Sequence, residues 1–395
     1  NLNIPRYVDS SEAAEHWDVY ASMFGGIPTA EIEELGEFWT AFPALKKALF
    51  TESGIPYVNV SVDDIKSAIK SHPDVVGFED AFNAAFSTFP AFLKEELIDR
   101  MESIEISKAE TVLSADIFER LKDIPLIDKY AAFQLLDDDW TGISIDLEVL
   151  QTEGFSATKE VDPNLVIKKK DGKDQEVQEG WVGHIIPFDL VQATLLSAET
   201  DELHGLESRL AEIPSEYESI LDEMTEEDKE SCNDVLTEEG DAFVPKEVSK
   251  KIKELKKDRS PESVALRTLL EKVESLVKSE KEIKAEIKAK SAALQAKTKD
   301  TIERLSDEQA LDLLEKKWIA PLIESIHKLP DTVIDSLVSK IQALQNKYAT
   351  TFFEVEQQIS ETEATLSGMI DDLEGNEYDM LGLNELKKLL GGSAE

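Results

Sequence analysis

Histidine and cysteine, the side chains most often used as metal ligands and nucleophiles, are few and scattered in this sequence. The histidines are His16, His72, His184, His204 and His327. No two of them have the spacing of metal ligands, so packing or surface roles are expected for each. Cys232 is the single cysteine, which excludes an internal disulfide, and no histidine lies near it in the sequence. Asp137-Asp138-Asp139 lacks the glycine and the spacing of a calcium loop. We therefore predict no catalytic residue and no metal site.

A cluster of lysines is the group of side chains that could contact phosphate. It consists of Lys168, Lys169, Lys170 and Lys173, on either side of Asp171-Gly172. A phosphate contact would require these ammonium groups to face nucleic acid within a larger assembly. The competing interpretation is a solvated strand edge, where lysines discourage pairing with other strands. The second interpretation is favoured, and the phosphate contact stays a hypothesis.

The lysine cluster lies on a predicted β-hairpin within a region of short helices. Val166-Ile167 precedes the lysines, Asp171-Gly172 has the composition of a tight turn, and a return strand passes through Trp181. We expect this hairpin near residues 165–186. The remainder of residues 29–213 is rich in aromatic residues and prolines, and its apolar residues return every three or four positions. This region is predicted to be a compact helical part.

Long helices are predicted for the second half of the sequence. Residues 214–259 read as an acidic connector and a helix, and Ser260-Pro261 has the N-cap hydroxyl and first-turn proline of a helix start. Apolar residues then recur in heptads over residues 269–294, and again for about 40 residues after Pro330-Asp331. We expect these two helices to fold back on each other as an antiparallel, coiled-coil-like hairpin within an assembly region, residues 260–395.

The helix after Pro330 carries a seam of apolar residues that a partner could bind. The candidate interface residues are Leu337, Ile341, Leu344, Tyr348, Phe352, Val355 and Ile359. Packing against another helix of the same chain explains most seams of this kind. A helix from another chain could occupy the same seam. Both interpretations stay open for these residues.

These patterns together predict a mainly α fold, with a short-helix globular part and a small β-hairpin followed by long antiparallel helices. The chain has 395 residues, of which 41% are hydrophobic, enough to build a core. Its 42 basic and 83 acidic residues give a net charge of −41, which argues against this chain wrapping DNA by itself. No stretch approaches the roughly 18 apolar residues of a membrane span, so we expect no membrane contact.

Four blocks of sequence carry a family resemblance. The first is Asn1-Leu2-Asn3-Ile4-Pro5-Arg6-Tyr7-Val8, and the others run from Ile124 to Trp140, from Asp162 to Val191, and from Asp371 to Leu386. Each resembles a block in the C-terminal part of the modification (methyltransferase) subunit of type I restriction-modification systems. The first block is similar to the junction at which those subunits leave their methylase domain. The four occur in the family's order and span nearly the whole sequence.

The resemblance implies that residues 1–28 are an exit segment and linker from a methylase domain outside this sequence. It also implies a parent enzyme that methylates adenine in DNA with S-adenosylmethionine. The Asn/Asp-Pro-Pro-Tyr/Phe motif that binds a flipped adenine does not occur here. Phe24-Gly25-Gly26, the nearest glycine-rich run, follows no predicted strand. We therefore expect this chain to bind no cofactor and to be inactive by itself.

In that family the C-terminal region helps to dock two modification subunits onto the helical spacers of a specificity subunit, which recognises the DNA sequence. The resemblance thus implies a cytoplasmic complex with a specificity subunit, a second modification subunit and a restriction subunit, in which DNA is contacted through the assembly. The alternative is a self-contained acidic coiled-coil scaffold without a link to DNA modification. The heptads suit both, but a scaffold gives no reason for the four blocks to occur together.

Overall fold

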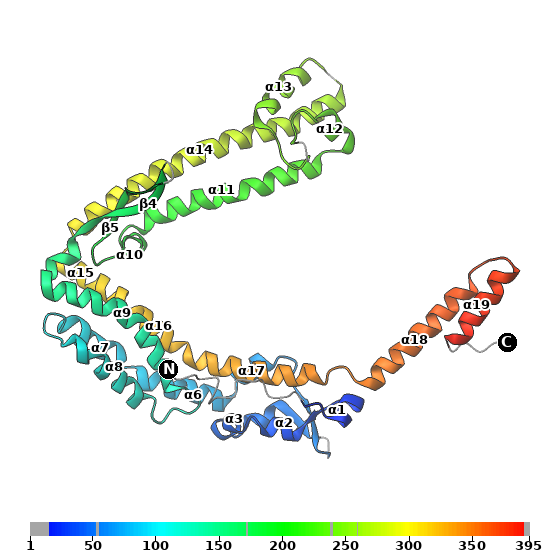
Figure 1. The fold of residues 1–395 in the computed structure, drawn as a ribbon, viewed down its shortest axis with the longest axis horizontal. Coiled ribbons are helices and arrows are strands. Elements are labelled where there is room, and N and C mark those ends of the chain that lie inside the picture. The colour runs from blue at the N-terminus through cyan, green and yellow to red at the C-terminus, as the bar shows by residue number, and fades with distance from the viewer. Residues whose placement is uncertain (1–15, 53–54, 171–172, 238–239, 259, 391–395) are drawn as a thin grey trace. The chain divides into compact units, whose positions relative to one another are not determined.

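The computed structural model describes residues 16–52, 55–170, 173–237, 240–258 and 260–390 and is mainly helical (Figure 1). The chain divides into two compact units, each assembled from segments that are distant in the sequence. Unit 1 comprises residues 1–90, 110–138 and 322–395, and unit 2 comprises residues 91–109 and 139–321. In the described part of the chain, no helix is both long enough and apolar enough to span a membrane.

Unit 1 combines short N-terminal elements with the last three helices of the chain. Its elements are α1 (Val19–Phe24), β1 (Ile27–Pro28), α2 (Thr29–Glu33), α3 (Gly36–Ala41), α4 (Leu45–Leu49), β2 (Phe50–Glu52), β3 (Tyr57–Val60), α5 (Ile65–Lys70), α6 (Pro73–Phe86), α17 (Leu329–Lys347), α18 (Phe352–Asp371) and α19 (Glu377–Leu389). The strands form an antiparallel sheet in the order β1-β3-β2. The sequence analysis did not predict this sheet, because strands this short carry too few residues to display alternation.

Helix α17 completes the hydrophobic core of unit 1. Ile334, Leu337, Val338 and Ile341 return at helical spacing and are buried against residues of α1 to α6. Two ion pairs flank this packing, from Lys66 to Asp335 and from Lys70 to Asp331, and both connect α5 with α17. The core therefore joins two segments that are separated by more than 240 residues in sequence.

Unit 2 contains the long helices and the hairpin. Its elements are η2 (a π-helix, Lys94–Asp99), η3 (a 3-10 helix, Phe155–Lys159), β4 (Val161–Lys170), β5 (Lys173–Gly183), α10 (Phe188–Thr194), α11 (Ser197–Glu223), α12 (Glu226–Ser231), α13 (Pro245–Leu255), α14 (Pro261–Glu303), α15 (Asp307–Leu314) and η4 (a π-helix, Glu315–Ile319). Four more helices have residues in both units, namely α7 (Phe89–Leu93), α8 (Ile106–Arg120), α9 (Lys129–Glu153) and α16 (Ala320–His327).

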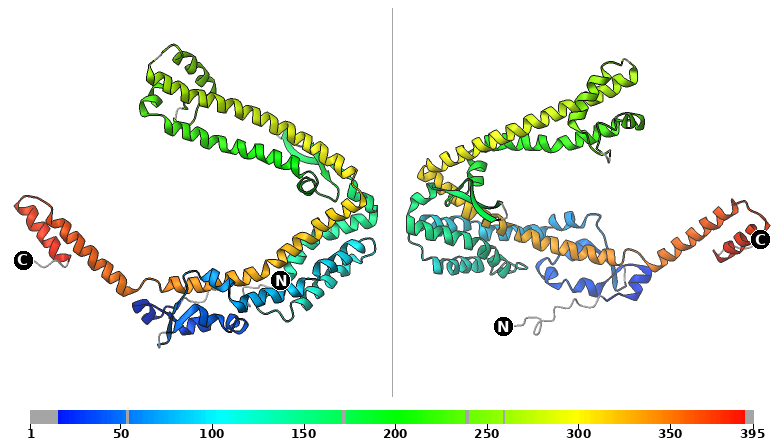
Figure 2. Two further views of the ribbon diagram at one scale, coloured as in Figure 1. Left: turned by 180° about the vertical axis from the view of Figure 1, so that it is seen from behind. Right: turned by 45° about the horizontal axis from the view of Figure 1, so that its top comes forward.

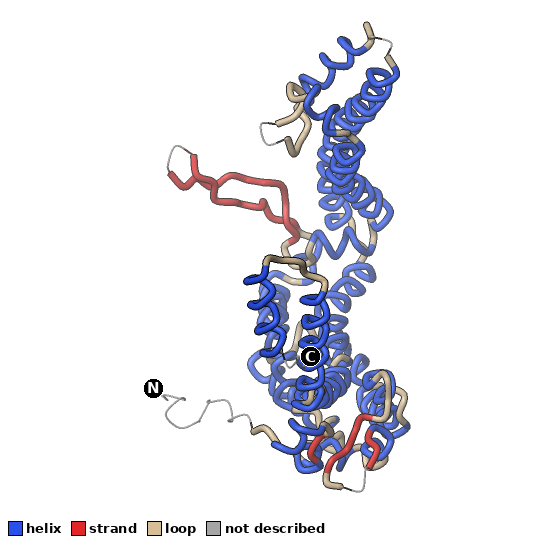
Figure 3. Tube along the Cα trace, turned by 90° about the vertical axis from the view of Figure 1, so that its right-hand side faces the viewer, coloured by secondary structure: helices blue, strands red, loops and turns tan. Residues whose placement is uncertain are grey.

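Strands β4 and β5 form the predicted antiparallel hairpin, which Figure 3 shows in red extending away from the helices of unit 2. Val166 faces Val177 across the two strands, and the register shifts between Pro163 and Leu165. At the base of the hairpin, the Lys299 ammonium group of α14 lies 3.4 Å from the centroid of the Trp181 ring. The tip residues 171–172 lie outside the described part of the chain.

Helices α11 and α14 pack side by side, as both views of Figure 2 show. Three ion pairs define their direction: Glu199 with Lys297, Glu202 with Lys290, and Glu223 with Lys272. Residue numbers rise along one helix as they fall along the other, so the pair is antiparallel. The helix that packs along α14 is thus α11, a pairing that the sequence analysis did not predict.

Two helix boundaries differ from the sequence expectations. Helix α11 continues through Pro214, although the compact helical part, residues 29–213, was expected to end just before this residue. Proline removes one hydrogen bond from a helix, and the burial of Ile213 and Ile220 on either side offsets that loss. The expectation of a single helix of about 40 residues after Pro330 is wrong, because the helical conformation is interrupted between α17 and α18. Thr351 begins the second helix as an N-cap.

Candidate protein interaction surface

The apolar seam predicted as a partner interface is divided by the structure into a buried half and an exposed half. Leu337, Ile341 and Tyr348 are at most 4% exposed and belong to the core of unit 1. Leu344 is partly buried against the same core. The side chains of Leu337, Ile341 and Tyr348 are therefore committed to the chain's own packing, whereas Leu344 keeps part of its surface exposed.

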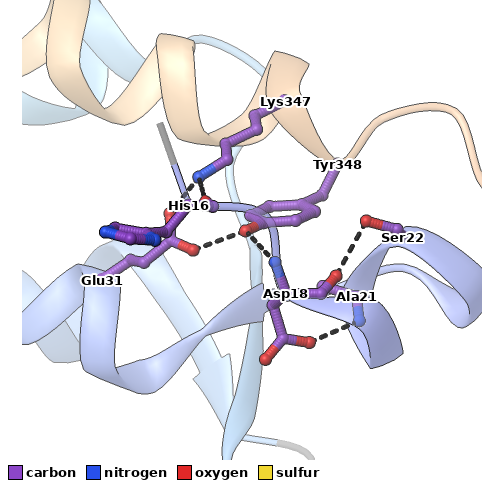
Figure 4. Close-up of polar contacts among 7 residues, drawn as sticks. All are labelled: His16, Asp18, Ala21, Ser22, Glu31, Lys347 and Tyr348. Carbon is purple, nitrogen blue, oxygen red and sulfur yellow. Dashed lines mark hydrogen bonds and ion pairs between the residues drawn. The ribbon is translucent and has the colours of Figure 1, made fainter. Parts of the chain in front are cut away.

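A cluster of polar contacts fixes the end of α17, as Figure 4 shows. The Tyr348 hydroxyl group donates a hydrogen bond of 2.5 Å to Glu31 of α2, and it accepts one of 3.2 Å from the backbone N–H of Asp18. The Lys347 ammonium group lies 3.0 Å from the other Glu31 oxygen and donates to the His16 carbonyl oxygen. The Asp18 carboxylate accepts from the Ala21 N–H and caps α1. This cluster attaches α1 and α2 to the point at which α17 ends.

The electrostatic environment of this cluster favours one set of protonation states. Burial raises the pKa of Tyr348, and the hydrogen bond to Glu31 raises it further. Burial alone would lower the pKa of Lys347, but the hydrogen bonds to Glu31 and Tyr348 outweigh it and the pKa is raised. The tyrosine therefore stays neutral and the lysine stays charged, the states that the Glu31 carboxylate stabilises as an acceptor.

Helix α18 is preceded by a reciprocal cap, whose N-cap residue Thr351 lies three residues after Tyr348. The Thr351 hydroxyl accepts from the Glu354 N–H at 3.1 Å, and the Glu354 carboxylate accepts from the Thr351 N–H at 3.0 Å. Such a capping box starts a new helix and sets its direction. It also explains why the heptad pattern, which continues across residues 348–351, does not produce one continuous helix.

Helix α18 exposes its apolar side chains, in contrast to α17. Among its residues only Ser367 is buried. We call the exposed set the α18 face; it comprises Phe352, Phe353, Val355, Ile359, Leu366, Met369 and, just past the helix, Leu373. Exposed fractions reach 60% at Phe353 and 62% at Met369. A helix usually gains its stability in a protein by burying such a face, and an exposed apolar face is typical of an interaction site.

Helix α19 folds back beside α18 and extends the same kind of surface. Lys387 of α19 pairs with both carboxylate oxygens of Asp371, at 2.7 and 2.8 Å. Tyr378, Leu381, Leu386 and Leu389 are all exposed on α19. The two helices thus contact each other without burying these apolar side chains.

The charge of α18 is entirely acidic. Its acidic residues are Glu354, Glu356, Glu361, Glu363 and Asp371, and it contains no lysine or arginine. An apolar stripe with acidic flanks is complementary to an apolar stripe with basic flanks. The surface is therefore suited to a basic amphipathic partner.

Helix α1 contacts α18. Tyr20 and Phe24 of α1, and Trp17 two residues before it, belong to the segment that the sequence analysis assigned to a linker. Trp17, Tyr20 and Phe24 are 55%, 44% and 64% exposed. Their spacing of three and four residues is a helical signal that the sequence contains, but it is too short to distinguish from chance. Large exposed aromatic side chains are enriched at protein interfaces.

The lysine cluster on the hairpin is matched by acidic residues of the opposite strand. Lys168 forms an ion pair with Glu179, and Lys169 lies opposite Asp174 in the strand register. Lys170 and Lys173 pair with each other in the register, but their side chains lie outside the described part of the structure. The phosphate contact stays a prediction for these residues.

Among the described residues, no group of three or more His, Cys, Asp or Glu side chains is arranged to hold a metal ion. Cys232 is buried in the small core between α11, α13 and α14, and burial raises the pKa of its thiol. The thiol therefore packs as an apolar group in the protonated form. The apolar surface of α18 and α19 is accordingly the feature of the described chain that points most directly to a function.

Comparison with protein-family models, with curated proteins and with solved structures gives no significant match for this chain. Its function is therefore inferred from the surface itself and from the four sequence blocks.

Proposed function

We propose that this chain is the C-terminal assembly region of a type I DNA adenine methyltransferase subunit. In this proposal the α18 face and α19 dock onto a helical spacer of the specificity subunit and so position a methylase domain over its target adenine. The observation that carries the proposal is the α18 face, a row of apolar side chains that the folded chain leaves exposed. The four blocks of family resemblance supply the identity of the partner.

The proposed mechanism is helix packing, without chemistry on this chain. Phe352, Val355, Ile359 and Leu366 are spaced by three, four and seven residues, the spacing of anchors on one side of a helix. The acidic flanks of α18 would select a spacer helix with basic flanks. DNA, the second modification subunit and the restriction subunit would join through the assembled complex, and S-adenosylmethionine would bind the methylase domain. The net charge of −41 agrees with DNA contacts being made by other parts of that complex.

Co-purification with a specificity subunit of the family tests this proposal. The double variant Ile359→Asp/Leu366→Asp should lose the complex, because two carboxylates would face the apolar surface of the partner helix. Val112→Asp is the matched control, since Val112 is a 48% exposed apolar residue of α8. It should retain the complex. A complex that survives the double variant, with an unchanged circular dichroism spectrum, would contradict the proposed surface.

The alternative function, a self-contained coiled-coil scaffold, has one observation in its favour. Helices α11 and α14 span 27 and 43 residues and pack antiparallel, with apolar contacts at both ends. A scaffold of this kind would be expected to associate with itself through its exposed apolar helix. Mass determination of the isolated chain separates the two: a monomer that pairs only with the specificity subunit favours assembly, and a stable homo-oligomer favours the scaffold.

A further inference from the structure

A pocket of about 430 Å³ lies in unit 1, between α1, β3 and the junction of α17 with α18. It is distinct from the α18 face, because the side chains of Ile359 and Leu366 do not line it. Gly25 and Gly26 form part of its wall, both with positive φ. A Cβ atom on Gly26 would lie 3.3 Å from the Tyr57 Cβ, so the backbone at Gly26 lies close to strand β3.

Aromatic rings provide one side of the pocket. The rings of Tyr20 and Tyr57 stack with centroids 4.6 Å apart, and the Phe24 ring lies 5.0 Å from that of Tyr20. Tyr20 and Phe24 are 44% and 64% exposed, so part of each side chain is accessible. The face of an aromatic ring carries partial negative charge and attracts cations.

A carboxylate and two amides provide the polar part of the lining. Glu354 is the one charged residue among the described residues that line the pocket. Its hydrogen bonds with the backbone N–H and the hydroxyl of Thr351 lower its pKa, so it is ionised at neutral pH. Asn59 and Gln345 also line the pocket with amide oxygens that can accept hydrogen bonds. A ligand with a positive charge and several N–H donors would be complementary to this set.

The same chain already uses this chemistry for one of its own cations. The Lys347 ammonium group lies 5.6 Å from the centroid of the Trp17 ring and 5.1 Å from that of Tyr348, and it pairs with Glu31. Two aromatic rings and one carboxylate thus hold an alkylammonium group next to the pocket. Tyr348 also lines the pocket, so the two aromatic groups adjoin.

We propose that the pocket of Tyr20, Phe24, Tyr57 and Glu354 binds an organic cation, either a guanidinium or an alkylammonium group. The rings would cover the apolar faces of the cation, and the Glu354 carboxylate would balance its charge. The amide oxygens of Asn59 and Gln345 would accept hydrogen bonds from its N–H groups. The source is either an arginine or lysine side chain of a partner protein or a free polyamine. This inference does not rest on the proposed docking of α18, because it concerns a small cation and the isolated chain.

Isothermal titration with Nα-acetyl-L-argininamide (argininamide below) tests the proposal. Nα-acetyl-L-citrullinamide (citrullinamide below), which carries no charge, is the neutral probe of nearly the same shape. Any cation accumulates around a chain of charge −41, so the titration is made at about 0.15 M NaCl to screen that diffuse attraction. We expect saturable binding of one argininamide and no binding of citrullinamide. Equal binding of the two probes would overturn the proposal, because it would show an apolar pocket without preference for charge.

Variants separate the pocket from the acidic surface, and the first pair leaves the net charge unchanged. Tyr20→Leu removes one ring and should weaken argininamide binding about tenfold. Tyr378→Leu is the matched control, since Tyr378 is 83% exposed on α19, and it should bind as the wild type does. Equal binding by wild type and Tyr20→Leu would overturn the proposal. Glu354→Gln is a second variant: glutamine also suits this cap position, so the helix start is kept while the charge is lost, and binding should fall.

Two further probes identify the source of the cation. Spermidine represents a free polyamine, and the peptide acetyl-Gly-Arg-Gly-amide represents a side chain of a partner protein. Tighter binding of the peptide supports a protein side chain as the natural ligand, and tighter binding of spermidine supports a polyamine. Failure of both probes to bind the wild type overturns the proposal, whatever the result of co-purification with a specificity subunit.

Discussion

Tyr348 holds unit 1 together through a hydroxyl group that is buried and bonded on both sides. It donates to Glu31 and accepts from the Asp18 N–H, so it links α17 to α2 and to the start of α1. The ring is 4% exposed and packs in the core. Because the residue is almost fully buried, loss of the hydroxyl would leave two polar groups without this partner.

We expect Tyr348→Phe to lower the free energy of unfolding by about 1–3 kcal/mol, the cost of leaving a buried polar group unsatisfied. The control is Tyr378→Phe, because Tyr378 is 83% exposed on α19 and its change should be within about 0.5 kcal/mol of zero. Urea denaturation followed by circular dichroism measures both. Equal stability of Tyr348→Phe and the wild type would mean that the hydrogen bond from Tyr348 to Glu31 makes no net contribution to the free energy of unfolding.

His184, at the end of the β4–β5 hairpin, gives unit 2 a pH dependence. Its Nδ1 lies 2.6 Å from Asp162 and its Nε2 lies 3.2 Å from Glu153. The hydrogen bond to Asp162 raises the pKa of His184 above its ordinary value of 6.5; burial opposes this, and Glu153 adds to it. A raised pKa means that the folded protein binds the proton more tightly than the unfolded chain does.

The His184 contribution to stability should be fully present below pH 6.5, its unfolded pKa, and lost as pH rises through the higher folded pKa. We expect the wild type to lose stability relative to His184→Gln as pH increases from about 6 to 9. Urea denaturation at several pH values measures this difference, and an NMR titration of the ring gives the folded pKa directly. A folded pKa at or below 6.5 would contradict the arrangement with two carboxylates.

Helices α17 and α18 carry one continuous apolar pattern but have opposite environments. Leu337 is fully buried on α17, whereas Ile359 is 53% exposed on α18. The break at Tyr348 and the capping box of Thr351 separate the two helices. Apolar residues of one continuous pattern therefore lie in the core on α17 and on an exposed surface on α18.

Aspartate substitutions distinguish these two environments. Leu337→Asp should destabilise the protein by at least about 4 kcal/mol, because it buries a carboxylate without a partner. Ile359→Asp should leave the stability within about 0.5 kcal/mol of the wild type, because its side chain reaches water. Thermal unfolding of the two purified variants measures the contrast. Similar losses for both would mean that α18 packs against the chain in a way that its exposure does not indicate.

The net charge of −41 affects the folded chain as a whole. Like charges repel each other more strongly in the compact state than in the unfolded chain, so this excess destabilises folding. The surface ion pairs, such as Lys328 with Glu324, are mostly exposed and are worth little individually. Salt screens both effects, but the repulsion acts across the entire surface and should be the larger of the two.

We therefore expect the melting temperature to rise as NaCl increases from about 0.02 to 0.5 M. Differential scanning calorimetry measures it, and a matched series with sucrose controls for preferential exclusion, which stabilises proteins without screening charge. A melting temperature that falls with NaCl would mean that the attractive ion pairs outweigh the repulsion among the acidic residues.

Local patterns in the sequence were sufficient to predict several elements of this protein. The helical periodicity, the N-cap at Ser260 and the Asp171-Gly172 turn depend on neighbouring residues, and the mainly helical fold, α14 and the β4–β5 hairpin agree with them. The acidic excess also follows from composition alone. The small sheet of unit 1 escaped prediction because its strands have only two to four residues.

Burial depended instead on segments that are far apart in the sequence. Leu337 is inside because residues of α1 to α6 cover α17, and nothing in the heptad pattern identifies those residues. Likewise, α14 packs along α11, which precedes it in the chain and whose interior Pro214 suggested an end. The periodicity of apolar residues specifies which side of a helix is hydrophobic, but the tertiary fold determines which segment packs against that side. For this reason the sequence supplied the apolar seam, and the packing of unit 1 determined which half of it remains exposed.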